Sequence, residues 1–285
     1  MANPITFSGF SYTYPRAGHP ALQIDELEIA AGEFCCVVGP GGAGKSTFCR
    51  VLSGLIPHFF HGEISGSAQV FGEETQTRSI YELAGMVGYV MDDPFDQLTR
   101  ATYTVYDEIA FGLQNIGMPA AEIRQRVDEV MQELEISELA DRVPTQLSGG
   151  QQQRVAIASI FARRPDILVM DEATGQLDPL GAASIYQLAR HFKDIGKTVI
   201  MVEPKLDPVL KYADRILVLD AGRLVAHGTP REILRSGHFE RLSLGLPSYP
   251  SLAKDLVAHG LVKETVPIHL EEACQVVKEA LHGDH

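Results

Sequence analysis

The stretch GPGGAGKST, Gly39 to Thr47, decides how the rest of this chain folds. It satisfies the pattern G-x-x-x-x-G-K-[ST], follows the apolar run FCCVV and opens a segment with helical spacing. In a strand-to-helix turn of this kind, backbone N–H groups close around phosphate oxygens, and the N-terminus of the helix adds a positive field. The alternative is a glycine-rich turn without a ligand. The strand before the motif and the helix after it favour the phosphate loop.

The residues of this loop have separate expected roles. The glycines let the backbone approach the phosphates, the lysine reaches the β- and γ-phosphates, and the serine ligates Mg²⁺. A phosphate loop alone does not distinguish a kinase from a GTPase or a transport motor. The nucleotide-binding residues that we predict here are Gly39, Gly41, Gly42, Gly44, Lys45, Ser46 and Thr47.

Two adjacent carboxylates follow a later apolar run, ILVMD. Asp171 closes that run, where a carboxylate can hold Mg²⁺ through water. Glu172 comes one step further, where it can polarise the attacking water. An acidic pair after a strand is common by chance, but its combination with a phosphate loop predicts nucleotide hydrolysis. We therefore expect Ser46 and Asp171 to be the metal ligands and Glu172 to be catalytic.

The segment LSGGQQQR, Leu147 to Arg154, lies between these two motifs. It reads as the start of a helix, with Ser148 as the N-cap and Gln151 at the capping-box position. An ordinary capped helix does not explain two successive glycines in its first turn, because glycine weakens a helix. We infer that something must approach the backbone closely at this point.

With these motifs the chain resembles the ATP-binding-cassette (ABC) ATPases, over about residues 3 to 235. The resemblance implies ATP and Mg²⁺ as cofactors. It also implies that the signature LSGGQ of one subunit grips the γ-phosphate of ATP held by the phosphate loop of a second subunit. A chain with one cassette must then pair head to tail. The implied signature contacts are Ser148, Gly149, Gly150 and Gln151, and Asp178 resembles the D-loop aspartate that links the two sites.

An aromatic residue in SYTYP resembles the side chain that stacks on adenine in this family. Tyr14, or alternatively Tyr12, fills that position, and an aromatic face suits a purine ring. The alternative for this residue is a strand aromatic that packs in the core.

The apolar patterns predict an α/β fold. The runs ITFSGFSYTY, LQIDELEI and FCCVVG read as strands, and ILVMD, TVIMV and RILVLD are continuously apolar, which is typical of strands covered on both faces in a mostly parallel sheet. Helical spacing extends from Ala120 to Ile136 and from Gln151 to Arg163. The resemblance implies a P-loop NTPase with a RecA-like core, an antiparallel β subdomain and an α-helical subdomain.

The domain limits follow from the motifs and from a change of pattern after Thr229 and Pro230. Several prolines and glycines punctuate the segment beyond them, and a stripe of apolar residues marks a final helix. The predicted limits are an ATPase domain over 1–236, a helical subdomain over about 92–162 and a C-terminal helical appendix over 237–285.

Composition limits the partners and the compartment. With 24 basic and 37 acidic side chains the net charge is −13, which would repel nucleic acid. No stretch reaches the roughly 18 apolar residues that span a bilayer, and no secretory signal precedes the first strand. The four cysteines lack zinc spacing, so we expect reduced, buried thiols.

Further phrases resemble the energy-coupling-factor (ECF) subgroup: GLIPHFFHGEISGSAQVFG, DDPFDQL, DEIAFGLQNIGMP and GLPSYPSLAKDLVAHGL. The resemblance implies uptake of vitamins, cobalt or nickel, together with a second ATPase, a transmembrane coupling protein and a membrane-embedded substrate-binding subunit. The chain would then lie on the cytoplasmic face of the membrane as a peripheral subunit. Asp92, Asp93 and Asp96 fall where such an ATPase meets an arginine-bearing coupling helix. A solvated acidic loop is the alternative.

Two positions depart from the family pattern. Asp92 stands where the family has the Q-loop glutamine, and Pro204, in VIMVEPKLDP, stands where it has the switch histidine. Proline has no titratable group and no N–H, so it cannot hydrogen-bond the γ-phosphate or orient water. Asp92 can still bind Mg²⁺, and we keep it as a catalytic-site residue. We predict that this chain's own site hydrolyses ATP slowly and that a heterodimer with a faster partner site is favoured.

Three alternative functions remain open. A soluble ABC ATPase of DNA repair or translation would carry long coiled coils or two cassettes, and neither is present in this chain. A regulatory subunit without a catalytic role is suggested by Pro204, and loss of transport on substitution of Glu172 would exclude it. A conventional ABC importer or exporter motor is the nearest alternative. The transported substrate is set by a different polypeptide.

Overall fold

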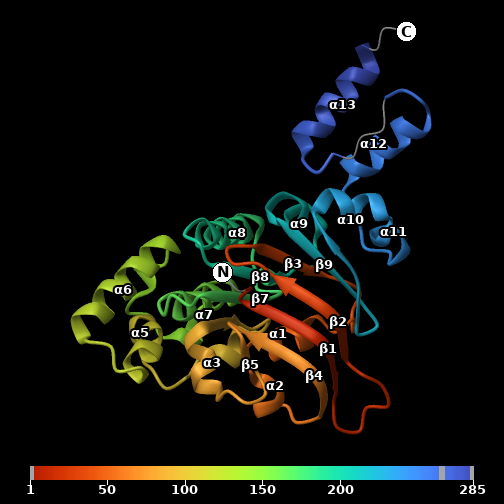
Figure 1. Ribbon diagram of the computed structural model, residues 1–285. Coiled ribbons are helices and arrows are strands. Elements are labelled where there is room, and N and C mark those ends of the chain that lie inside the picture. The colour runs from red at the N-terminus through yellow and green to blue at the C-terminus, as the bar shows by residue number, and fades with distance from the viewer. Residues whose placement is uncertain (1–2, 263–266, 283–285) are drawn as a thin grey trace.

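The computed structural model describes residues 3–262 and 267–282, through which one ten-stranded mixed sheet runs in the order β5-β4-β1-β2-β10-β9-β3-β8-β7-β6 (Figure 1). The strands are β1 Ile5–Thr13, β2 Leu22–Ile29, β3 Phe34–Val38, β4 Glu63–Val70, β5 Glu73–Glu74, β6 Val87–Val90, β7 Ile167–Asp171, β8 Thr198–Val202, β9 Arg215–Asp220 and β10 Arg223–Gly228. The longer helices are α1 Lys45–Leu52, α3 Ile80–Met86, α5 Val105–Asn115, α6 Ala120–Glu133, α7 Gly149–Phe161, α8 Pro179–Asp194, α9 Leu206–Tyr212, α10 Pro230–Ser236, α12 Ser248–Ala258 and α13 Leu270–His282. The short helices are α2 Leu55–His58, α4 Pro94–Gln97, α11 His238–Arg241 and the two 3₁₀ turns Ser137–Leu139 and Pro144–Gln146.

The two halves of this sheet pair differently. On one side β1 pairs antiparallel with β2 and β4, and β4 pairs antiparallel with β5. On the other side β3, β6, β7, β8 and β9 pair parallel to one another. The expected combination of a parallel core with an antiparallel β subdomain is therefore confirmed. Because parallel strands end at the same edge, the segments that follow β3, β7 and β8 meet there.

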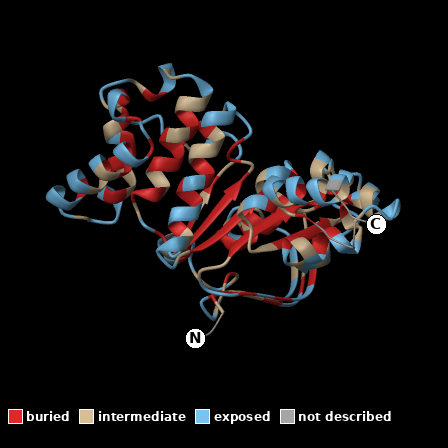
Figure 2. Cartoon of the chain, turned by 90° about the horizontal axis from the view of Figure 1, so that it is seen from above, coloured by how far each residue is buried: buried red, intermediate tan, exposed pale blue. Residues whose placement is uncertain are grey.

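The parallel strands are buried on both faces, which explains their continuous apolar runs. Successive residues point to opposite faces: in β3, Phe34 and Cys36 join the core beneath α5–α8, whereas Cys35 and Val37 join the core around α1. Figure 2 shows the buried residues along the strands and on the inner sides of the helices. The sheet thus separates two hydrophobic cores.

Helices α5 and α6 project farthest from the sheet, and α7 lies between them and the strands (Figure 1). The apolar stripe of α6 is buried as its spacing predicts, but the helix ends at Glu133 rather than at Ile136, because Glu135 takes a positive φ of 54°. Helix α7 begins at Gly149, two residues earlier than the spacing indicated, and ends at Phe161 rather than at Arg163. A positive φ at Arg164 follows that end.

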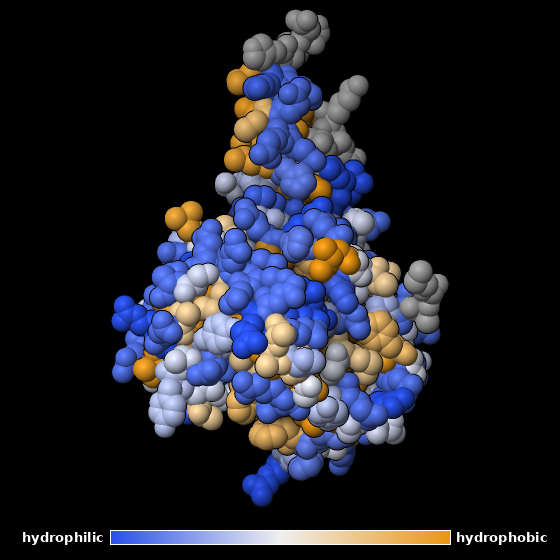
Figure 3. Space-filling view, turned by 90° about the vertical axis from the view of Figure 1, so that its left-hand side faces the viewer, coloured by the Kyte–Doolittle hydropathy of each residue, from blue (hydrophilic) through white to orange (hydrophobic). Residues whose placement is uncertain are grey.

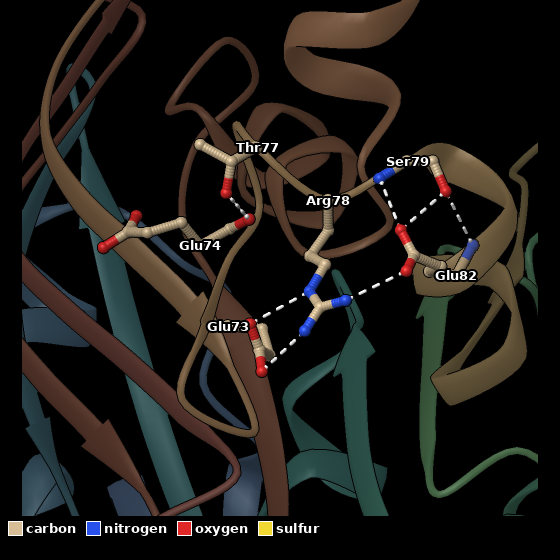
Figure 4. A network of polar contacts seen from close by, with 6 residues as sticks. All are labelled: Glu73, Glu74, Thr77, Arg78, Ser79 and Glu82. Carbon is tan, nitrogen blue, oxygen red and sulfur yellow. Dashed lines mark hydrogen bonds and ion pairs between the residues drawn. The ribbon is translucent and has the colours of Figure 1, made fainter.

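A polar network fixes the connection from β5 to α3 (Figure 4). Arg78 donates Nε to Glu73, 2.9 Å away, and its guanidinium also reaches Glu82 at 2.9 Å. Glu82 in turn accepts hydrogen bonds from the backbone N–H and the hydroxyl of Ser79, which closes a capping box at the start of α3. This local structure sets the direction in which the chain enters β6.

The C-terminal helices α12 and α13 extend away from the sheet (Figure 1). Figure 3 shows apolar side chains along one side of this extension. Three leucines of these two helices are exposed: Leu252, Leu270 and Leu281. Phe239 of α11, in contrast, is fully buried in the core beneath α5–α8. The domain boundary at residue 236 stays a prediction. No helix in the described parts of the chain is both long and apolar enough to cross a bilayer.

The expectation that every cysteine is buried is wrong for one of the four. Cys35, Cys36 and Cys49 are buried, and burial raises the pKa of each of these thiols, so they are poor nucleophiles. Cys274 is exposed, because α13 packs its Ala273 side inward and turns Cys274 outward.

Candidate functional site

The phosphate loop connects β3 to α1, as its sequence predicts. Gly39 has a φ of 155°, and a Cβ atom there would lie 2.1 Å from the carbonyl oxygen of Leu219. Gly44 has a φ of 98° and immediately precedes α1, and its Cβ would lie 2.5 Å from the carbonyl oxygen of Ala21. Only glycine fits these two positions. The loop conformation therefore depends on Leu219 of β9 and on Ala21, immediately before β2, as well as on the motif itself.

Lys45 is held over this loop at the first turn of α1. Its Nζ donates hydrogen bonds to the carbonyl oxygens of Gly39 and Pro40, each at 3.0 Å, and it lies 4.0 Å from a carboxylate oxygen of Glu172. Only 9% of Lys45 is exposed. The ammonium group is thus aimed into the loop, where the β- and γ-phosphates are expected.

The two expected metal ligands meet at the edge of the sheet. Asp171 is buried at the end of β7, and its carboxylate accepts a hydrogen bond from the hydroxyl of Tyr89 at 3.3 Å. Burial raises the pKa of Asp171 above its ordinary range, and the side chains of Ser46 and Tyr89 partly offset the rise. A carboxylate held in this way is stabilised by a cation.

Two further carboxylates lie close to Asp171. The charges of Asp92 and Glu172 both raise the pKa of Asp171 further, which places all three acidic groups in one region of negative potential. Glu172 has a φ of 48°, its N–H donates to the carbonyl oxygen of Val202 at 3.1 Å, and its side chain is 44% exposed. The expected catalytic carboxylate is therefore presented to solvent from a fixed backbone.

The two candidate tyrosines have different surroundings. Tyr12 is fully buried and donates to the carbonyl oxygens of Phe60 and His61, at 3.3 and 3.1 Å. Tyr14 is half-buried beside α1, with its hydroxyl 3.2 Å from that of Thr47 and accepting a hydrogen bond from Arg50 at 3.0 Å. Tyr12 is thus a core aromatic, and Tyr14 stays the predicted adenine contact next to the phosphate loop.

The signature segment forms the N-terminus of α7. Ser148 accepts a hydrogen bond from the N–H of Gln151, and the Gln151 side chain accepts one from the N–H of Ser148 at 3.0 Å, so the predicted capping box is present. A Cβ at Gly149 would lie 3.0 Å from the Gln176 side-chain oxygen, and one at Gly150 would lie 3.4 Å from the Leu177 side chain. Residues 176–178 therefore lie next to the first turn of α7, and neither contact by itself requires a glycine.

A cleft of about 380 Å³ lies between the signature and residues 176–178. Arg154 and Asp178 line it, and Asp178 also caps α8 through a 2.7 Å hydrogen bond from the N–H of Gly181. None of the residues that line this cleft comes from the phosphate loop. One chain thus presents two separate half-sites. The loop half-site contains residues 39–47 with Asp171 and Glu172, and the signature half-site contains residues 148–151 with Asp178.

Several polar residues of this region were not predicted as site residues. Tyr89 donates a hydrogen bond to Asp171. Gln97 closes the loop over residues 89–97, because its side chain accepts from the N–H of Met91 and donates to the carbonyl oxygen of Tyr89, both at 3.1 Å. Glu203 is buried beside the end of β8. The only signal for Glu203 in the sequence is a charged residue directly after the apolar run TVIMV.

Comparisons with known proteins place the chain among ATP-binding subunits of transporters. Residues 22–175 match the profile of the family described as ABC transporter. The chain is 39% identical over 260 residues to the energy-coupling factor transporter ATP-binding protein EcfA1 of Lacticaseibacillus paracasei, with 90% of each chain covered.

Two solved structures are also similar to this chain. The cbiO1 protein of Clostridium perfringens, part of the ABC transporter complex cbiONQ, superposes with a TM-score of 0.73 at 30% identity, covering 89% of this chain and 100% of that one. An ATP-binding cassette solved as a dimer in a post-hydrolysis state with ADP and Pi superposes with a TM-score of 0.69 at 28% identity, covering 80% and 99%.

Proposed function

Because the chain belongs to the ABC transporter family of ATP-binding proteins, and within it resembles the energy-coupling-factor type, we propose that it is one half of an ATPase pair that drives uptake of a vitamin or a metal-type micronutrient. Hydrolysis of ATP to power a transporter is the activity of this family. The proposal adds the class of cargo, the asymmetry of the pair and the membrane partners, and it locates the chain on the cytoplasmic face of the membrane.

The observation that carries the proposal is the separation of the two half-sites. The loop half-site has groups for phosphate and metal, whereas the cleft beside Ser148 and Asp178 has no residue of the phosphate loop. A second cassette, turned head to tail, would complete both sites. The dimeric form of a similar cassette with ADP and Pi supports this arrangement.

The residues of the loop half-site fit Mg²⁺ and ATP. The Ser46 side chain is near enough to Asp171 to lower the pKa of its carboxyl, and a hydroxyl, a carboxylate and phosphate oxygens are the ligands that Mg²⁺ takes in nucleotide sites. No group of three or more His, Cys, Asp or Glu side chains within the described residues could hold a metal ion. An ion that is completed by the phosphates needs no such group. Mg²⁺ would neutralise the charge that develops on the phosphates.

Two features of the same half-site support slow hydrolysis. Pro204 is exposed at the turn after β8 and has no polar side-chain atom with which to orient water near the γ-phosphate. Asp92 adds a negative charge near Asp171, where the family has a neutral amide. Glu172 remains. The site would therefore bind Mg²⁺-ATP and turn it over slowly, while the partner's site, completed by this chain's signature, would be fast.

The segment around α4 supports docking on a membrane partner. Asp92, Asp93 and Asp96 are all exposed, and Phe95 between them is 46% exposed. Asp93 accepts a hydrogen bond from the N–H of Phe95 at 2.9 Å, so one of the three carboxylates is engaged in capping α4. An acidic surface with an exposed aromatic ring suits an arginine-bearing helix.

Co-purification from membranes tests this proposal. The tagged chain would be isolated, its bound proteins would be identified, and the ATPase activity of Pro204→His would be compared with that of the wild type. We expect a second ATPase that carries the switch histidine, a transmembrane coupling protein, and little gain from Pro204→His.

Two other outcomes would change the proposal. Recovery of this ATPase alone, with activity strongly raised by Pro204→His, would indicate a homodimer whose own sites are slow. Recovery of no membrane protein would contradict the role in transport.

A further inference from the structure

Glu203 is a buried carboxylate at the end of β8 that the proposed function does not use. Only 1% of the residue is exposed. Its carboxylate accepts hydrogen bonds from the Thr174 hydroxyl at 2.7 Å, from the Tyr186 hydroxyl, and from the N–H of Lys205 at 3.0 Å. Burial of a carboxylate is costly unless its oxygens are hydrogen-bonded. The burial of Glu203 at the end of β8 therefore depends on these three donors staying in place.

The donors come from three different elements. Thr174 follows β7, Tyr186 lies on α8, and Lys205 immediately precedes α9. The hydroxyls of Thr174 and Tyr186 are also 3.3 Å apart, and the Tyr186 ring stacks on Tyr212 of α9 with a centroid distance of 5.3 Å. We call Glu203, Thr174 and Tyr186 the Glu203 cluster. Hydrogen bonds to a charged acceptor are roughly twice as strong as neutral ones, so this cluster ties the three elements together.

Thr174 occupies the middle of a segment that connects the two half-sites. Two residues before it is Glu172, whose N–H is bound to Val202 of β8 at 3.1 Å. After it, the N–H of Leu177 donates to the Thr174 carbonyl oxygen at 3.1 Å, and Leu177 packs against the position of Gly150 in the signature. The segment 172–178 thus carries the expected hydrolytic carboxylate at one end and the signature contacts at the other.

We propose that Glu203 is a positioning residue, whose buried carboxylate fixes Thr174 and through it holds segment 172–178 in register with the signature. This inference rests on the proposed function, because it concerns the turnover of the same paired ATPase. Pro204 supplies no polar side chain at the end of β8. The polar contacts of this turn with Thr174 and Tyr186 therefore come from the buried Glu203 carboxylate, one residue earlier. Loss of the cluster would disturb both half-sites to which the segment leads.

The test compares three variants in the assembled transporter complex. Thr174→Val keeps the shape but removes the hydroxyl, whereas Thr174→Ser keeps the hydroxyl. Thr198→Val is the matched control, because Thr198 is as buried as Thr174 but lies at the start of β8, at the other end of that strand from Glu203, where its hydroxyl accepts from the N–H of Gly32 at 3.1 Å. We expect Thr174→Val to lower kcat about tenfold, with KM for ATP unchanged and with activity largely retained in Thr174→Ser. Thr198→Val should lower thermal stability alone.

A second measurement does not depend on activity. Hydrogen–deuterium exchange of the peptide that contains residues 172–178 should become faster in Thr174→Val and stay unchanged in Thr198→Val. If Thr174→Val does not fold, Tyr186→Phe removes one donor only and should change kcat and exchange in the same direction, by less.

The inference is overturned if Thr174→Val behaves like Thr198→Val in kcat and in exchange, or if Thr174→Ser fails to retain activity. Failure of the proposed function would look different. The wild-type chain would then recover no membrane partner, while the exchange measurement would still report on the cluster.

Discussion

Asp171 sits at the junction of the two sequence motifs that define the loop half-site. Its carboxylate is buried, and the charges of Asp92 and Glu172 add to the effect of burial in raising its pKa, so a nearby cation would favour its ionised form. Tyr89 donates a hydrogen bond to it at 3.3 Å, and Ser46 lowers its pKa, so its surroundings partly offset the effect of burial. If Asp171 holds Mg²⁺ as we propose, its buried charge should lower the stability of the nucleotide-free chain.

Asp171→Asn tests this account of a single residue. The amide removes the buried charge and keeps an oxygen that can accept from Ser46 or Tyr89. We expect the Tm of the nucleotide-free chain to rise by about 2–4 °C, which corresponds to roughly 1 kcal/mol for a chain of this size. The further rise of Tm on addition of Mg²⁺-ATP should be lost. A lower Tm in the nucleotide-free variant would show that Asp171 is mainly a structural acceptor.

The sequence predicted the individual elements better than their ends. The runs ILVMD, TVIMV and RILVLD are strands over the quoted residues, because burial on both faces leaves a clear apolar signature. LQIDELEI is a strand over its quoted residues because its apolar residues are spaced for one buried face. The ends of α6 and α7 were displaced by two or three residues, since single residues with positive φ at 135 and 164 are not visible in periodicity.

The glycines of the phosphate loop offer a prediction at the level of the strand-to-helix turn. Gly44→Ala would place a Cβ against a backbone oxygen at positive φ, so we expect a loss of about 2 kcal/mol or more in unfolding free energy. Gly41 has no positive φ and nothing within 4 Å of a Cβ, so Gly41→Ala should leave stability nearly unchanged. Chemical denaturation of both variants checks this pair. Equal losses would mean that the loop tolerates no side chain for another reason.

Contacts between distant segments could not be predicted from the sequence. Thr174 and Glu203 are separated by 29 positions, and their pairing depends on the parallel arrangement of β7 and β8. Tyr89 reaches Asp171 across 82 positions because β6 and β7 are neighbours. The sequence motifs predicted which polar side chains lie at the ends of the strands. The order of the strands in the sheet decides which of these side chains contact one another.

The C-terminal boundary gives a prediction for the whole molecule. A chain that ends at residue 236 loses Phe239, which is fully buried in the main core. Because loss of a buried Phe costs about 3–5 kcal/mol, that truncation should be clearly less stable than the full chain. A chain that ends at residue 246 keeps Phe239 and the leucines that pack after it, and its Tm should stay close to that of the full chain. Similar Tm values for both truncations would place the boundary at 236.

The central claim is that the two ATP sites of the assembled pair hydrolyse at different rates. The site on this chain's own phosphate loop would be slow, and the partner's site, which this chain completes with its signature, would be fast. In the proposed pair, Glu172 would serve the loop half-site of this chain, and Gly150 would serve the partner's site. The most direct test therefore compares ATP turnover of the assembled complex with Glu172→Gln or Gly150→Asp in this chain alone. We predict that Glu172→Gln retains more than about half of the turnover, whereas Gly150→Asp lowers it about tenfold or more. Equal loss in the two variants, or a larger loss in Glu172→Gln, would contradict the asymmetric motor.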